Sequence, residues 1–102
     1  MQISKEKLDK IKEEILRVLY TNSPQMLFTC DVAREVIRDE EFIKRLLNEL
    51  EKDKFVVRIK KNPQGIDYTL RSRWRLSTSV YDSYKKIQEN RVIYDERNNT
   101  YT

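Results

Sequence analysis

The spacing of the apolar residues changes near residue 54, and this change constrains the fold more than any other feature of the sequence. Between residues 39 and 53 apolar side chains recur every three or four positions, the spacing of one helix face. Between residues 55 and 60 apolar and polar residues alternate, the spacing of a strand. This order predicts an α+β fold in which helices precede a sheet. The helical stripe consists of Phe42, Ile43, Leu46, Leu47 and Leu50.

Two more helices are predicted before this stripe. Ser4 is the candidate N-cap of a helix that runs to about residue 20, where TNSP at residues 21–24 disfavours its continuation. The apolar run MLF at residues 26–28 predicts a brief strand. Thr29 then caps a helix over residues 29–37, and Asp39 caps the helix that carries the stripe.

A β-hairpin is predicted after the third helix. NPQG at residues 62–65 places proline and glycine where a tight turn favours them, between a strand at residues 55–60 and a return strand at residues 66–76. In TLRSRWRLS, residues 69–77, every second residue from 71 to 75 is arginine, so the arginines share one face and Trp74 lies on the other. Trp74 is expected in the core, with stacking on a base as the alternative. The proposed pairing places Arg58 and Lys60 on the same outward face as Asp67, Thr69, Arg71 and Arg73.

The C-terminal segment is predicted to begin with a fourth helix. Ser79 is its candidate cap, Asp82 stands in the capping-box position, and Tyr84 and Ile87 are expected to face inward. The last residues, RVIYDERNNTYT, alternate weakly and are expected to pair as a short strand or hairpin. The sequence leaves two interpretations open: the chain contains either one helix-plus-hairpin unit or two such units in succession.

Length and composition narrow the class of protein. The 102 residues predict one domain, residues 1–102, with its core in residues 4–76 and a C-terminal helix and tail in residues 79–102. The absence of histidine excludes histidine-based catalysis and histidine zinc sites, and a single cysteine excludes an internal disulfide. No apolar run of spanning length and no signal-peptide pattern are present, so a cytoplasmic protein is expected, without membrane, metal, cofactor or enzyme activity. The charged fraction of 37% is typical of thermophile proteins.

The net charge of +4 is unevenly distributed along the chain. Residues 1–53 contain ten basic and twelve acidic residues, whereas residues 54–102 contain eleven basic and five acidic residues. A surface that binds a polyanion is therefore expected in the second half of the chain.

The order of the predicted elements resembles the winged helix-turn-helix family of DNA-binding proteins, over about residues 4–70. TCDVAREVI at residues 29–37 resembles the first helix of the helix-turn-helix pair. FIKRLLNELEKDKFVVRI at residues 42–59 is similar to a recognition helix followed by a buried aromatic residue and a wing strand, and IDYTL at residues 66–70 to the return strand. Small winged-helix proteins of archaea and their viruses have a similar size and composition. The resemblance implies that the third helix enters a major groove and that the wing reaches the adjacent backbone or minor groove.

The recognition helix expected from this resemblance has an acidic start. Asp39, Glu40 and Glu41 suit the positive end of a helix dipole but oppose phosphate binding. The basic hairpin is therefore expected to supply most of the phosphate contacts. The candidate DNA-binding residues are Lys44, Arg45 and Asn48 on the helix and Arg58, Lys60, Lys61, Arg71, Arg73 and Arg75 on the hairpin.

Two functions from different classes follow from these features. The first is a double-stranded DNA-binding protein that acts as a small transcriptional regulator, with a homodimer formed through the first helix or the C-terminal segment as a further expectation. The second is a protein-protein interaction module without catalytic activity, in which two helix-hairpin units bind a partner peptide in a groove or at a strand edge. Charge asymmetry favours the first, and the acidic start of the third helix favours the second.

Overall fold

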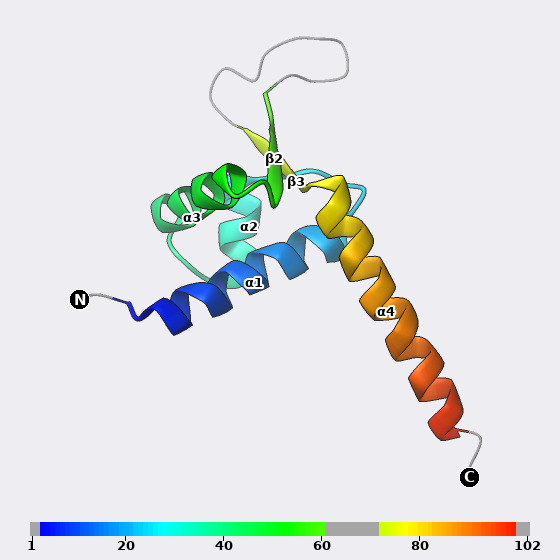
Figure 1. The fold of residues 1–102 in the computed structure, drawn as a ribbon. Coiled ribbons are helices and arrows are strands. Elements are labelled where there is room, and N and C mark those ends of the chain that lie inside the picture. Colours follow the sequence, from blue (N-terminus) through cyan, green and yellow to red (C-terminus); the bar gives the residue numbers. More distant parts are fainter. Residues whose placement is uncertain (1–2, 61–71, 100–102) are drawn as a thin grey trace.

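The structure, a computed structural model, describes residues 3–60 and 72–99 of the chain. This part of the chain contains four helices and one antiparallel three-stranded sheet, which confirms the predicted α+β class. Figure 1 shows α1, α2 and α3 packed together beside the sheet, while α4 leaves the sheet and extends away from them. The elements are α1 Lys5–Asn22, β1 Leu27–Phe28, α2 Thr29–Val36, α3 Glu40–Lys52, β2 Val56–Ile59, β3 Arg73–Leu76 and α4 Thr78–Asn99.

Two of the predicted helix caps are confirmed. The Ser4 hydroxyl accepts a hydrogen bond from the backbone N–H of Lys7 at 3.2 Å, at the start of α1. The Asp39 carboxylate accepts one from the backbone N–H of Phe42 at 3.1 Å, at the start of α3. Each bond satisfies a backbone donor that has no partner within its own helix, so the sequence fixes both starts locally.

The other two predicted caps are wrong by one or two residues. Thr29 is already the first residue of α2, and the Asp31 carboxylate instead accepts from the backbone N–H of Phe28 at 3.1 Å. In α4 the Ser77 hydroxyl, not that of Ser79, accepts from the backbone N–H of the third helical residue at 3.4 Å. Both segments offer several adjacent capping side chains, so residue type alone does not select one.

The strand order in the sheet is β1-β3-β2, and β3 pairs antiparallel with both neighbours. Arg58 faces Trp74 across the β2–β3 pair, and Ile59 faces Arg73. This register places residues 60–72 between the two strands. The described return strand therefore starts at Arg73; the predicted turn at residues 62–65 and the segment at residues 66–71 lie outside the described residues.

The prediction of which residues in the first hairpin strand point inward is wrong. Val56 is 2% exposed and belongs to the inner face, whereas Phe55, expected as a buried aromatic residue, is 42% exposed. Arg58 lies on the same face as Trp74, because residues directly opposite each other in an antiparallel pair share a face. Val56 and Val57 are both apolar, so alternation alone does not decide which of them points inward.

The core lies where α1, α2 and α3 meet the inner face of the sheet. Trp74 is only 1% exposed, and its indole Nε1 donates a hydrogen bond to the hydroxyl of Thr29 at 2.8 Å. The prediction that Trp74 is a core residue is therefore confirmed. The α3 stripe contributes Ile43, Leu46, Leu47 and Leu50, and α1 contributes Ile11, Ile15, Val18 and Leu19.

The predicted C-terminal strand or hairpin is wrong for residues 91–99, because α4 continues as one helix to Asn99. A second helix-plus-hairpin unit is therefore absent from the described part of the chain. Extending a helix that already exists adds one hydrogen bond per ordered residue, whereas an isolated two-stranded hairpin is only marginally stable. Ile87, expected to face inward, is 60% exposed.

The first half of α4 is held against α1 by aromatic side chains. The Tyr20 ring lies 5.3 Å from that of Tyr81 and 5.5 Å from that of Tyr84, and its hydroxyl donates to Gln88 Oε1 at 2.7 Å. Burial, followed by the nearby Glu13 carboxylate, raises the pKa of Tyr84 above its ordinary value. Tyr84 is therefore uncharged at neutral pH, which suits its packing against Tyr20.

The turn between α2 and α3 contains a residue type that its backbone disfavours. Ile37 has a φ of 55° and is 86% exposed. A left-handed backbone costs a β-branched residue about 1–2 kcal/mol, and glycine avoids this cost. Ile37→Gly should therefore raise the free energy of unfolding by roughly 1 kcal/mol in urea titration. Ile37→Val keeps the β-branch and serves as the control, and a glycine variant less stable than wild type would contradict the explanation.

Candidate nucleic-acid interface

The exposed face of α3 carries two adjacent basic residues. Ile43, Leu46 and Leu47 direct the opposite face into the core, which leaves Lys44 and Arg45 exposed. The Arg45 guanidinium lies 5.5 Å from the centre of the Phe42 ring, which supports its stem at the surface. These two predicted residues are therefore placed together and are accessible to a ligand.

The acidic residues of α3 are largely occupied by structural contacts. Asp39 caps the helix, and Glu49 forms a 3.1 Å ion pair with Lys12 of α1. Glu51 lies 3.8 Å from the Arg58 guanidinium of β2. Glu40 and Glu41 remain exposed in the first turn, where their negative charges interact favourably with the positive end of the helix dipole. The acidic start of α3 thus has a local structural explanation.

Asn48 and Arg58, both predicted to contact DNA, bind each other instead. Arg58 Nη2 donates a hydrogen bond to Asn48 Oδ1, and its guanidinium lies 4.8 Å from the centre of the Trp74 ring. The Arg58 side chain is 24% exposed, and its Nε atom is buried. The prediction of a shared basic face is wrong for Arg58, because Arg58 lies on the inner face of the sheet and Arg73 on the outer face.

The outer face of the sheet carries Arg73 and Arg75. The Arg73 guanidinium lies 4.5 Å from the centre of the Phe28 ring of β1, and Arg73 is half-buried. Arg75 is exposed and donates to the backbone carbonyl of Leu76 at 2.9 Å. Lys60 is exposed just beyond β2. The remaining predicted residues, Lys61 and Arg71, lie outside the described residues.

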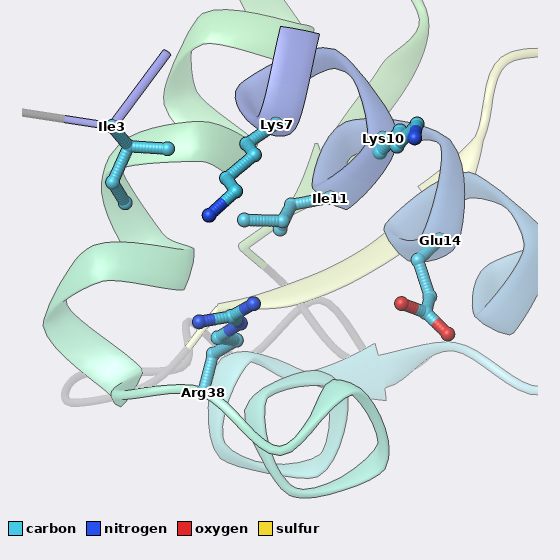
Figure 2. A pocket seen from close by; sticks show the side chains of 6 residues that line it. All are labelled: Ile3, Lys7, Lys10, Ile11, Glu14 and Arg38. Carbon is cyan, nitrogen blue, oxygen red and sulfur yellow. The ribbon is translucent and has the colours of Figure 1, made fainter.

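A cleft of about 290 Å³ lies between the N-terminal half of α1 and the turn that precedes α3. Figure 2 shows the Lys7 amine and the Arg38 guanidinium pointing into the space beside Ile11. Sequence reasoning missed this cleft because it joins residues distant in the chain and because the lysines of α1 follow the pattern of a solvated helix face. The lining residues are Ile3, Lys7, Lys10, Ile11, Glu14 and Arg38.

Two negative findings concern the described residues. No three cysteine, aspartate or glutamate side chains gather there into a group that could hold a metal ion. None of the described helices combines the length and the apolar character that crossing a membrane requires.

Comparisons with known proteins identify the fold. No protein-family model matches the chain, and no curated protein matches it in sequence. MepR of Staphylococcus aureus in its DNA-binding conformation is 26% identical, with a TM-score of 0.61 over 93% of this chain and 68% of MepR. ZitR of Lactococcus lactis, as an apo mutant, is 16% identical, with a TM-score of 0.60 over 95% of this chain and 71% of ZitR. The chain therefore has the fold of the winged helix-turn-helix regulators.

Two further MepR structures show how far this likeness extends. A MepR–DNA complex is 20% identical, with a TM-score of 0.59 over 95% of this chain and 85% of that chain. A MepR mutant from a multidrug-resistant clinical isolate is 26% identical, with a TM-score of 0.60, but this chain spans only 54% of its length. The order α2, α3, β2, β3, with β2 and β3 paired antiparallel, matches the helix pair and hairpin of this fold.

Proposed function

We propose that this protein is a double-stranded DNA-binding transcription regulator. The observation that carries the proposal is the exposure of Lys44 and Arg45 on α3, the helix in the recognition position. MepR, with the same fold, is described in a DNA complex and as a transcription regulator of an efflux pump. Catalysis forms no part of the proposed role, since the structural neighbours are transcription regulators.

The proposed contacts fall into two groups. Lys44 and Arg45 are assigned to the major groove, where a lysine or arginine on a recognition helix reaches base edges or phosphates. Lys60 and Arg75 are assigned to the phosphate backbone beside the groove. Arg73 is assigned to the same group, although part of its guanidinium is covered by the Phe28 ring. The sequence-predicted Lys61 and Arg71 join this second group as candidates. Asn48 and Arg58 are assigned to neither, because they bind each other.

We further propose that the regulator acts as a homodimer joined through α4. The apolar face of α1 is buried in the core of its own chain, and Tyr20 is covered by α4, so α1 has little apolar surface to offer a second copy. Figure 1 shows that α4 continues well beyond its contact with α1. Ile87, 60% exposed, lies on this projecting helix. A second copy of α4 that covered Ile87 would remove this apolar side chain from water, which favours association.

The peptide-binding alternative is not supported. It required two helix-hairpin units, and α4 continues as a helix through residues 91–99. The structural neighbours also include regulators bound to DNA.

The DNA-binding proposal is tested by the salt dependence of binding to a random-sequence duplex. Wild type should bind at low salt, and the double variant Lys44→Gln/Arg45→Gln should bind more weakly. Each lost phosphate contact should reduce the slope of log affinity against log salt by about 0.9. A base-contacting residue should instead cost about 1–3 kcal/mol with less change in slope.

Matched variants separate the local contacts from net charge. The double variant Lys60→Gln/Arg75→Gln removes two positive charges from the wing, as many as Lys44→Gln/Arg45→Gln removes from α3. It should also reduce the slope of log affinity against log salt. Lys5→Gln/Lys10→Gln removes two exposed charges from α1, and its slope should stay close to that of wild type. A wild-type protein that binds no duplex at low salt would refute the proposed function.

A further inference from the structure

Arg58 stands at the junction of the recognition helix, the wing and the core. Its guanidinium donates to the Asn48 side-chain oxygen, lies 3.8 Å from the Glu51 carboxylate and covers the Trp74 ring at 4.8 Å. Trp74 in turn donates to Thr29 at the first residue of α2. One continuous set of side-chain contacts therefore joins α3, β2, β3 and α2.

The contacts of the Arg58 side chain can hold α3 and β2 rigidly together. A guanidinium is planar, so it can stack on an indole ring and donate in its own plane to two side-chain acceptors. Asn48 and Glu51 lie on adjacent positions of the same α3 face, because residues three apart are neighbours on a helix. Arg58 thus contacts α3 at two positions, which restrains both the distance and the rotation between this helix and β2.

We infer that Arg58 is a positioning residue that holds the base of the wing in a fixed orientation relative to the recognition helix. This role rests on the proposed DNA-binding function. Lys44 and Arg45 on α3 must meet one groove while Lys60 and Arg75 meet the neighbouring backbone. Fixing the two elements relative to each other in the free protein removes an ordering cost from binding. Asn48 is its partner in the same role.

The geometry distinguishes this role from a direct phosphate contact. The Arg58 side chain is 24% exposed, and the Glu51 carboxylate beside its guanidinium offsets its charge. A phosphate-binding arginine adds to the salt dependence of affinity, whereas a positioning residue lowers affinity without changing the number of counterions released. The slope of log affinity against log salt therefore separates the two roles.

The test compares wild type with Arg58→Met, Asn48→Ala and the double variant. Affinity for a random-sequence duplex is measured at several salt concentrations and well below the unfolding temperature. Arg58→Met should bind about tenfold more weakly with the wild-type slope, an effect typical of coupling between contacting residues. The double variant should bind about as weakly as Arg58→Met, because either change breaks the same contact. Arg58→Lys, which lacks the planar guanidinium, should not restore affinity.

Val56→Ala controls for a general loss of stability. Val56 is buried in the same strand and makes no contact with DNA in this proposal. This variant should unfold at lower urea concentration yet bind DNA with wild-type affinity while folded. If Val56→Ala weakens binding as much as Arg58→Met does, the positioning role is refuted in favour of simple destabilisation.

The remaining outcomes are also decisive. A slope reduced by about one unit in Arg58→Met identifies a phosphate contact and overturns the positioning role. Wild-type affinity in Arg58→Met, or additive losses in the double variant, overturns it as well. A wild-type protein that binds no duplex refutes the proposed function, and the positioning role falls with it, whereas the other outcomes leave DNA binding intact.

Discussion

Replacing Trp74 with alanine should lower the free energy of unfolding by about 3–5 kcal/mol, the usual cost of deleting a buried aromatic side chain. Trp74 is 1% exposed and pairs with residues on both sides, Leu27 of β1 and Arg58 of β2. Its loss removes apolar burial and leaves a cavity between the sheet and the helices. Since domains of this size are stable by only about 5–15 kcal/mol, the variant should be close to unfolding at 37 °C.

Urea unfolding followed by circular dichroism measures this effect. Phe55→Ala is the matched control, because Phe55 is an aromatic residue next to β2 that is 42% exposed. The control should lose much less stability than the Trp74 variant. Equal losses in the two variants would contradict the assignment of Trp74 to the centre of the core.

Conservative variants separate the packing of Trp74 from its hydrogen bond. Thr29→Val keeps the shape of Thr29 but leaves the indole N–H buried without an acceptor, which should cost about 1–3 kcal/mol. Trp74→Phe removes the donor as well as part of the ring. Once Trp74→Phe is in place, adding Thr29→Val should cost less than it does in wild type, because no donor is then left unpaired. Additive losses would show that the 2.8 Å contact contributes little.

The sequence was sufficient for α1 and α3 because the signals for these two helices are local. The stripe from Phe42 to Leu50 and the caps Ser4 and Asp39 depend on residues within a few positions of one another. No such local signal decides which residues of β2 face the core. Either Val56 or Val57 could point inward on composition alone, and the choice is settled by the fit of Trp74 and Leu76 against the helices.

The candidate site was predicted in part for the same reason. Lys44 and Arg45 follow from the helical stripe, because the residues opposite a buried face are exposed. Asn48 and Arg58 lie ten residues apart and on different elements, so their contact depends on the packing of α3 against β2. Once the strand phase is reversed, Arg58 points toward α3, and its assignment changes from DNA contact to positioning.

Changing Ile87 to glutamate should separate the proposed dimer into monomers. Ile87 is 60% exposed on α4, so the single chain loses little packing, and its stability should change by less than about 0.5 kcal/mol. A buried carboxylate in the dimer would oppose association strongly. Sedimentation equilibrium should therefore show a dimer for wild type and a monomer for the variant. Lys85→Gln changes the charge by the same amount from nearly the opposite side of α4 and should stay dimeric.

The loss of the dimer should weaken DNA binding through avidity. Two linked recognition helices bind half-sites about 34–36 Å apart, and linkage can raise affinity by about 10²–10⁴-fold over a single module. Wild type should therefore bind a duplex spanning two half-sites far more tightly than a duplex spanning one, and Ile87→Glu should bind both about equally. A wild-type protein that is monomeric, or a variant that remains dimeric, would refute association through α4. Because Lys44 and Arg45 are unchanged in the variant, its residual binding to the short duplex reports the affinity of one chain alone.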